Sequence, residues 1–158
     1  ILIYLAEKST KFLPGDMRHK YETLQWLMFQ MGGVRPMFGQ SNHFSHYAVD
    51  KIPYAINRYV NESKRLYGVM DKQLANTEYL AGDEYTIADI ATHPWAQGFE
   101  RRGVDENDYP NVKKWVELIH NRPAVKRGFE VLADERPSGN FTAAEREILF
   151  GKTQFKKR

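Results

Sequence analysis

Cysteine is missing from the chain, and its absence limits both the chemistry and the architecture that the chain can have. None of the 158 residues is a cysteine. Disulfide bonds, cysteine-ligated metal sites and a cysteine nucleophile are therefore excluded within this chain. The absence also suits a reducing compartment, and we expect the protein to be cytoplasmic.

Long hydrophobic runs and signal-peptide features are also lacking. The opening apolar run, Ile1 to Ala6, is far too short to span a membrane. It has neither a basic flank nor a small-residue cleavage site. We therefore expect no membrane association.

The body of the chain lacks a large net charge of either sign. The net charge is +3, but Lys152, Lys156, Lys157 and Arg158 lie in the last eight residues without an acidic neighbour. Without these four residues, basic and acidic side chains nearly balance. Basic and aromatic residues do not alternate along one face, so we predict a solvated tail and no nucleic-acid partner.

Apolar residues recur at helical spacing, and neither a strand signal nor an internal repeat is present, which predicts an all-α domain. Pro14-Gly15 and Arg136 to Asn140 read as linkers, and the polar stretch from Gln40 to Asp50 reads as a loop. Helices are expected at about residues 1–8, 17–38, 51–74, 86–102, 111–121, 123–132 and 142–151. Gly32-Gly33 and Pro36 should bend or loosen the second half of the helix over 17–38.

The strongest local signal is the start of the helix at Thr86. The Thr86 hydroxyl suits an N-cap, and the Asp89 carboxylate can reach back to the Thr86 N–H, which together form a capping box. Thr142 and Glu145 have the same spacing. We expect a structural role for Thr86 and Asp89.

Arg58 is the polar residue most suited to binding a ligand. It lies early in the helix over 51–74, where an arginine can grip a carboxylate with two parallel hydrogen bonds. The alternative is a surface pair with Glu62 four residues on, worth about 0.3 kcal/mol. From the residues alone, the surface pair is the expected interpretation.

Two other groups of side chains are candidate sites. His43 and His46 are three apart, but without cysteine or a matching carboxylate we expect no metal. Met37 and Phe38 extend an apolar stripe whose default place is the core, although its end could line a pocket for an apolar ligand.

Several segments resemble the helical domain of nu-class glutathione transferases. They cover about four fifths of the chain, and the block from Ile52 to Tyr59 selects the nu class over its relatives. The resembling segments include Leu24–Leu27, Ile52–Tyr59, Tyr79–Ala91, Tyr109–Val112 and Arg122–Val125.

The resemblance implies a two-domain protein. Residues 1–8 would be the end of the last helix of a thioredoxin-like domain, otherwise absent from this chain. Residues 9–16 would be a linker, 17–135 the transferase C-terminal helical domain, and 136–158 a tail with a short helix and a basic end. The catalytic groups at the glutathione sulfur would lie upstream of Ile1, so none is expected in this chain.

The resemblance also implies an activity and a site. The protein would be a homodimeric, glutathione-dependent disulfide oxidoreductase acting on a small disulfide or electrophile, with weak conjugating or peroxidase activity. Arg58 would reach a glutathione carboxylate, and Met37, Phe38 and Gln40 would form the rim of the acceptor pocket. Arg35 departs from the glycine of the family pattern and should reshape the dimer face or that pocket. The alternative is a non-catalytic binding or regulatory module.

Overall fold

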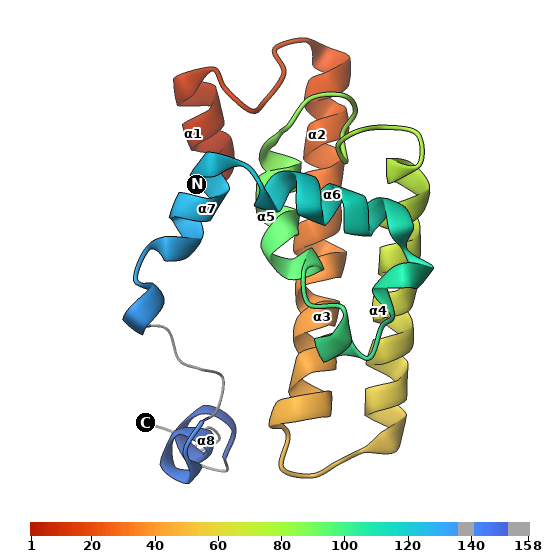
Figure 1. The fold of residues 1–158 in the computed structure, drawn as a ribbon, viewed down its shortest axis with the longest axis vertical. Helices are drawn as coiled ribbons and strands as arrows, with labels where there is room; N and C mark the ends of the chain where they lie inside the picture. The colour runs from red at the N-terminus through yellow and green to blue at the C-terminus, as the bar shows by residue number, and fades with distance from the viewer. Residues whose placement is uncertain (136–140, 152–158) are drawn as a thin grey trace.

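The computed structural model describes residues 1–135 and 141–151, and these residues form an all-helical fold (Figure 1). In this described part no β-strand is present, and Tyr79 and Gly82 make one isolated bridge. The predicted all-α class is confirmed. The predicted linker over 136–140 and the basic end over 152–158 lie outside the described residues.

The first long helix is continuous but contains two π-helical turns. It consists of α2 (Met17–Phe29), the π-helical turn η1 (Gln30–Val34), α3 (Arg35–Asn42) and a second π-helical turn, η2 (His43–Tyr47). Pro36, which has no N–H to donate, falls at the start of α3, directly after the wide turn. The expected irregularity at the glycines is therefore confirmed.

The loop expected over Gln40 to Asp50 is wrong for most of its length. Helical turns continue to Tyr47, and the non-helical connection runs only from Ala48 to Ile52. Aromatic packing explains the difference, because Phe44 stacks on Tyr59 of the next helix with ring centroids 5.4 Å apart. The polar composition of this stretch concealed that contact.

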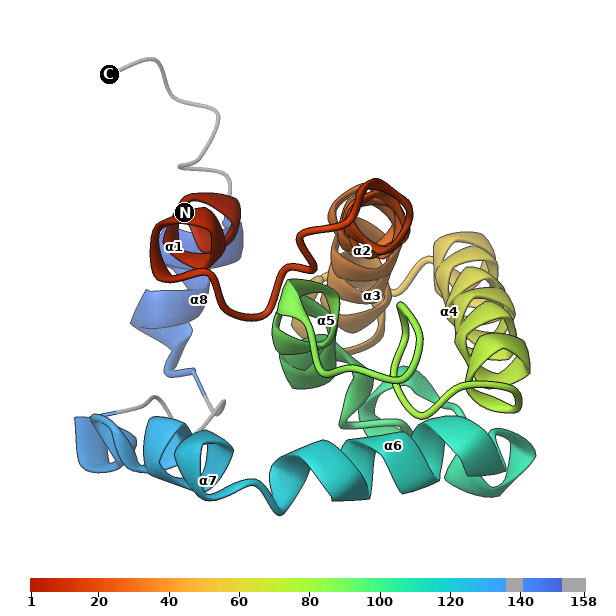
Figure 2. The same cartoon turned by 90° about the horizontal axis from the view of Figure 1, so that it is seen from above.

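Helices α2, α3, α4 (Pro53–Leu74), α5 (Ile87–Ala96) and α6 (Pro110–His120) surround the core. Helix α4 lies beside α3, α5 lies beside α2, and α6 crosses α4 and α5 (Figures 1 and 2). Helix α4 faces the core with Ser63, Leu66, Tyr67, Met70 and Leu74.

Tyr67 is at the centre of this core. Its ring lies 4.7 Å from that of Phe38 and 4.5 Å from that of Phe99, and its hydroxyl donates to the Ala96 carbonyl at 2.8 Å. Burial raises the pKa of Tyr67 to about 12, so the hydroxyl stays protonated and remains a donor.

Helix α5 ends at Ala96, six residues before the expected end at Arg102. Gln97 is extended and Gly98 has a φ of 96°, a conformation that favours glycine, so the helix cannot continue. Two short 3₁₀ turns follow, η3 (Glu100–Arg102) and η4 (Glu106–Asp108).

The remaining elements lie at the periphery of the fold. Helix α1 (Leu2–Ser9) packs through Ala6 on a small cluster with Leu27 and Ile87. Helix α7 (Pro123–Glu130) follows α6, then come the 3₁₀ turn η5 (Ala133–Glu135) and α8 (Ala143–Phe150). The capping box expected at Thr142 and Glu145 forms at the start of α8.

Candidate functional site

The capping box at the start of α5 forms as predicted. The Thr86 hydroxyl accepts the Ala88 N–H at 3.3 Å, and Asp89 Oδ2 accepts the Thr86 N–H at 3.0 Å and the Thr86 hydroxyl at 3.1 Å. Thr86 and Asp89 are both buried. These contacts hold the first turn of α5 in the middle of the domain.

Asp89 does more than cap its own helix. Its Oδ1 accepts the Leu80 N–H and the Trp115 indole N–H, each at 3.0 Å, so one carboxylate connects the loop before α5, α5 itself and α6. Burial raises the pKa of Asp89, although all of these hydrogen bonds favour the carboxylate. All of these hydrogen-bond partners lie within the domain, which fits a structural role.

The surface around Arg58 forms a hollow between α3 and α4. We call it the Arg58 hollow; its volume is about 640 Å³. Its lining residues are Met37, Tyr54, Asn57, Arg58, Tyr59, Asn61, Glu62 and Arg65. Met37 comes from α3 and the others from α4, so the wide turn η1, which sets the orientation of α3, also places this wall.

The charges in the Arg58 hollow leave Arg58 available. Glu62 accepts two hydrogen bonds from Arg65, each 2.8 Å long, and these bonds are the largest cause of its lowered pKa, with Arg58 contributing less. Within the described residues Arg58 has no ion pair, and its side chain is exposed. The alternative of an Arg58–Glu62 surface pair is therefore wrong in this structure.

Of the three residues expected at the pocket rim, only Met37 lines this hollow. Gln40 is exposed one turn further along α3 without lining it. The expectation that Phe38 forms part of the rim is wrong. Phe38 is 0% exposed and packs on Tyr67, so it belongs to the core. Residues 37 and 38 of a helix point about 100° apart, and that angle separates a wall residue from a core residue.

The histidines and Arg35 lie in other surroundings. His43 packs on Phe44 and Phe150, whereas His46 contacts the Arg101 carbonyl, so the two rings do not converge. Among the described residues no cluster of three or more metal-ligating side chains is present. Arg35 lies over Trp95, with its guanidinium 5.7 Å from the ring centroid.

The sequence did not predict the roles of two polar residues, Asp71 and Arg102, that hold segments of the fold in place. Asp71 of α4 accepts the backbone N–H groups of Asn111 (2.8 Å) and Val112 (3.1 Å) and so caps α6. Arg102 is buried and bonds to oxygens of the segment after α5. The Asp71 contacts join distant segments, whereas those of Arg102 go mainly to carbonyls four and five residues away, and neither residue has a spacing in the sequence that signals its role.

No helix in the described part of the chain combines the length and apolar character needed to cross a membrane.

Comparison with known proteins assigns the fold to a family. Residues 50–123 match the family described as glutathione S-transferase, C-terminal domain. The disulfide-bond oxidoreductase YfcG of Escherichia coli (strain K12) is 49% identical over 138 residues, covering 86% of this chain and 64% of that protein. The chain therefore belongs to the glutathione transferases, as their C-terminal helical domain.

Solved structures agree with this assignment. A glutathione transferase family member from Pseudomonas fluorescens with two glutathione bound is 48% identical, with a TM-score of 0.76 over 82% of this chain and 60% of that one. One from Pseudomonas putida with one glutathione disulfide per subunit is 43% identical, with a TM-score of 0.77 over 82% and 59%.

YfcG and a second Escherichia coli relative, the disulfide-bond oxidoreductase YghU, 47% identical, are of the nu-class type, which confirms the resemblance seen in the sequence. The chain spans about half to two thirds of the length of the curated relatives it matches.

Proposed function

We propose that this chain is the helical half of a glutathione-dependent disulfide-bond oxidoreductase and that Arg58 binds a carboxylate of glutathione. The observation that carries the proposal is the state of Arg58, an exposed arginine in a hollow whose neighbouring carboxylate, Glu62, is already held by Arg65. A free guanidinium can form two parallel hydrogen bonds to a ligand carboxylate.

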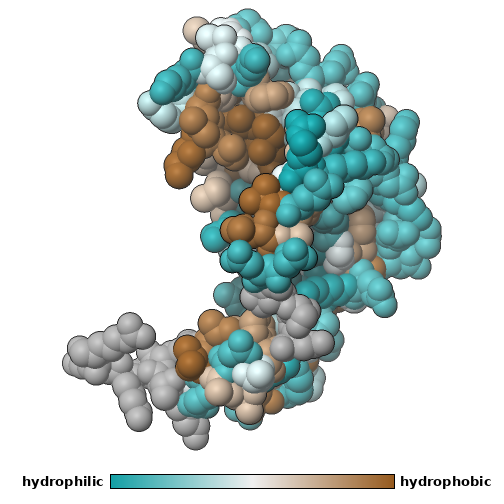
Figure 3. All heavy atoms as spheres, turned by 60° about the vertical axis from the view of Figure 1, so that its left-hand side comes forward, coloured by the Kyte–Doolittle hydropathy of each residue, from teal (hydrophilic) through white to brown (hydrophobic). Residues whose placement is uncertain are grey.

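The groups that activate the glutathione sulfur are assigned in this proposal to a thioredoxin-like domain upstream of Ile1. The surface of α1 supports this, because Ile1, Tyr4 and Leu5 are at least half exposed although they are apolar or aromatic. Figure 3 shows hydrophobic residues gathered on the face where α1 lies. A second domain packed there would cover them.

The proposed reaction is thiol–disulfide exchange in two steps. A glutathione thiolate attacks one sulfur of a small disulfide, which breaks the S–S bond, forms a mixed disulfide and releases one thiolate. A second glutathione thiolate then attacks the mixed disulfide and gives glutathione disulfide and the second thiolate. The names of the Pseudomonas structures, with two glutathione or one glutathione disulfide bound, support this stoichiometry for the family.

Further parts of the proposal follow from the same assignment. Weak conjugation of electrophiles or weak peroxidase activity would use the same activated thiolate. Glutathione would be the co-substrate without a metal, and a cytoplasmic location would provide it in reduced form. Met37 and Gln40 would lie on the acceptor side of the site.

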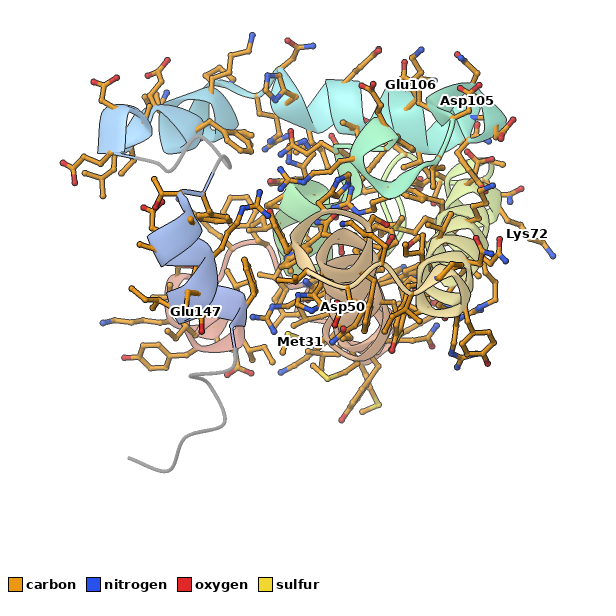
Figure 4. All side chains as sticks on the ribbon, turned by 90° about the horizontal axis from the view of Figure 1, so that it is seen from below. Met31, Asp50, Lys72, Asp105, Glu106 and Glu147 are labelled. Atoms are coloured by element: carbon orange, nitrogen blue, oxygen red, sulfur yellow. The ribbon has the colours of Figure 1, made fainter. Side chains whose placement is uncertain are left out.

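A homodimer is proposed from the surface of α2. Met17, Tyr21 and Met28 of α2, and Met31 of the adjoining turn η1, are each more than half exposed. Met31 points outward from the helices in Figure 4. A second copy that covered this row would remove it from water, and analytical ultracentrifugation of the complete protein tests this directly.

The activity is tested by reduction of hydroxyethyl disulfide by glutathione with the complete protein. Arg58→Ala should raise the Michaelis constant for glutathione about tenfold, because a charge-assisted hydrogen bond is lost. The matched control is Arg18→Ala, an exposed arginine on α2 that pairs with Glu22. An unchanged Michaelis constant would remove Arg58 from the site.

The alternative, a non-catalytic binding or regulatory module, predicts a different result. The complete protein would then bind glutathione in calorimetry but show no turnover with any small disulfide. Fold alone cannot separate the two, because function depends on the site.

A further inference from the structure

A second arginine, Arg102, is buried without an acidic partner. It is 4% exposed. Its Nη1 donates to three neutral oxygens: the Tyr67 hydroxyl at 3.2 Å and the carbonyls of Gln97 at 3.1 Å and Gly98 at 2.7 Å. The guanidinium also lies 4.5 Å from the centroid of the Phe38 ring.

The acidic residues that follow Arg102 in the chain are engaged elsewhere. Asp105 accepts the Asn107 N–H at 2.9 Å, and Glu106 pairs with Lys113 at 2.7 Å; both lie at the outer edge of the fold in Figure 4. In residues 1–135 and 141–151 no carboxylate makes an ion pair with Arg102.

The electrostatic surroundings therefore disfavour this charge. Burial lowers the pKa of the Arg102 guanidinium, Tyr67 counteracts this, and the nearby cation Arg101 lowers the pKa further. A buried charge that lacks a counter-charge costs free energy, and a bound anion would offset that cost.

Arg102 borders a hollow that has room for such an anion. We call it the arginine hollow; its volume is about 620 Å³, and it shares no lining residue with the Arg58 hollow. Its lining residues are Asn42, Tyr47, Pro94, Trp95, Gln97, Gly98, Arg101 and Arg102. This lining contains two arginines and no acidic residue.

Unused hydrogen-bonding groups occur at the same place. The Nε of Arg102 and the Oδ1 of Asn42 are buried without a partner in the described structure. The oxygen and nitrogen of an asparagine amide exchange places by a half turn, so Asn42 can also offer an N–H donor to a ligand oxygen. The buried, unpartnered groups point to a ligand rather than to a finished internal network.

The second arginine is held in position. Arg101 donates to the Tyr47 hydroxyl and lies 5.4 Å from the centroid of the Tyr47 ring. Phe150 of α8 stacks on the same ring at 5.0 Å. Tyr47 is thereby held between α8 and Arg101, and Arg101 is presented at the edge of the hollow.

We propose that the arginine hollow binds a small carboxylate with an apolar body, its oxygens held by Arg101 and Arg102 and its body against Pro94 and Trp95. The two guanidinium groups supply charge-assisted hydrogen bonds. The proline and tryptophan supply an apolar wall of the kind that small-molecule sites use.

Calorimetric titration of the complete protein with benzoate tests the proposal. Benzoate should bind, and benzamide, its neutral analogue of the same shape, should not. Arg101→Ala and Arg102→Met should each weaken benzoate binding about tenfold or more, because each removes a charge-assisted partner. Arg101 is exposed, so its variant should fold even if Arg102→Met does not. Arg58→Ala is the matched control and should bind benzoate as the unmodified protein does.

Four results would overturn the proposal: no heat of binding at millimolar benzoate, equal binding of benzamide, unchanged affinity in the Arg101→Ala variant, or loss of binding in Arg58→Ala. The last would place the anion in the Arg58 hollow instead. Failure of disulfide reduction by the complete protein would reject the proposed function and leave these binding results unaffected.

Discussion

Replacing Asp89 should be among the most destabilising single changes in the chain. The side chain is 0% exposed, and its two oxygens accept from Leu80, Thr86 and Trp115 in three different segments. Asp89→Ala leaves three N–H donors buried without an acceptor. Asp89→Asn keeps the size but places an NH₂ group where one oxygen stood.

The magnitude follows from the donors that lose their acceptor. Each unpaired buried N–H costs about 1–3 kcal/mol, and removal of a buried charge returns part of this, so Asp89→Ala should cost about 4 kcal/mol. In Asp89→Asn the NH₂ group is best placed toward Thr86, because the Thr86 hydroxyl can turn and accept from it. Only the hydrogen bond from the Thr86 N–H is then lost, at a cost of about 2 kcal/mol. Stabilities of about 5–15 kcal/mol are usual, so either loss is large.

Urea unfolding followed by tryptophan fluorescence and circular dichroism measures both values. The matched control is Asp83→Ala, which removes an exposed carboxylate from the same segment and should change stability by less than about 0.5 kcal/mol. An Asp89→Ala variant as stable as the Asp83→Ala control would refute the view that this carboxylate holds the three segments together.

Two other changes test the structure at a distance from Asp89. Asp71→Ala should cost about 1.5 kcal/mol in urea unfolding, because α6 loses the carboxylate that accepts from Asn111 and Val112; a change within error would show that the cap is dispensable. Burial lowers the pKa of His93, so its stabilising contribution is complete above pH about 6.5 and is lost as the pH falls through the lower folded-state value. His93→Gln should flatten that acid-side loss in unfolding midpoints measured from about pH 5 to pH 7.5, and an unaltered slope would assign it to other groups.

The sequence predicted several structural features that depend only on neighbouring residues in the chain. The capping boxes at Thr86 and Thr142 and the loosened, π-helical turn at Gly32-Gly33 each depend on residues within a few positions, and all three are present. One error arises where distant segments decide: Phe44 extends the first long helix by stacking on α4. The other error is local, because α5 ends early where Gly98 takes a positive φ.

The candidate sites divide in the same way. Helical position placed Arg58 early in α4, and the structure leaves its side chain exposed, but the pairing of Glu62 with Arg65 required side-chain geometry. Phe38 was misplaced because a stripe of apolar residues does not reveal which member faces the core. Arg102 gave no signal in the sequence, since its partners are mainly backbone carbonyls.

The π-helical turn η1 has a consequence for how this chain can tolerate changes in length. Each helical residue rotates the following chain by about 100°, so removing one residue from Gln30–Val34 would turn all of α3 relative to α2. Phe38 would leave the core, and Met37 would leave the Arg58 hollow. A methyl group added at Gly32 meets nothing within 4 Å, so Gly32→Ala should be accepted where its deletion is not. At this turn the number of residues is more constrained than their identity.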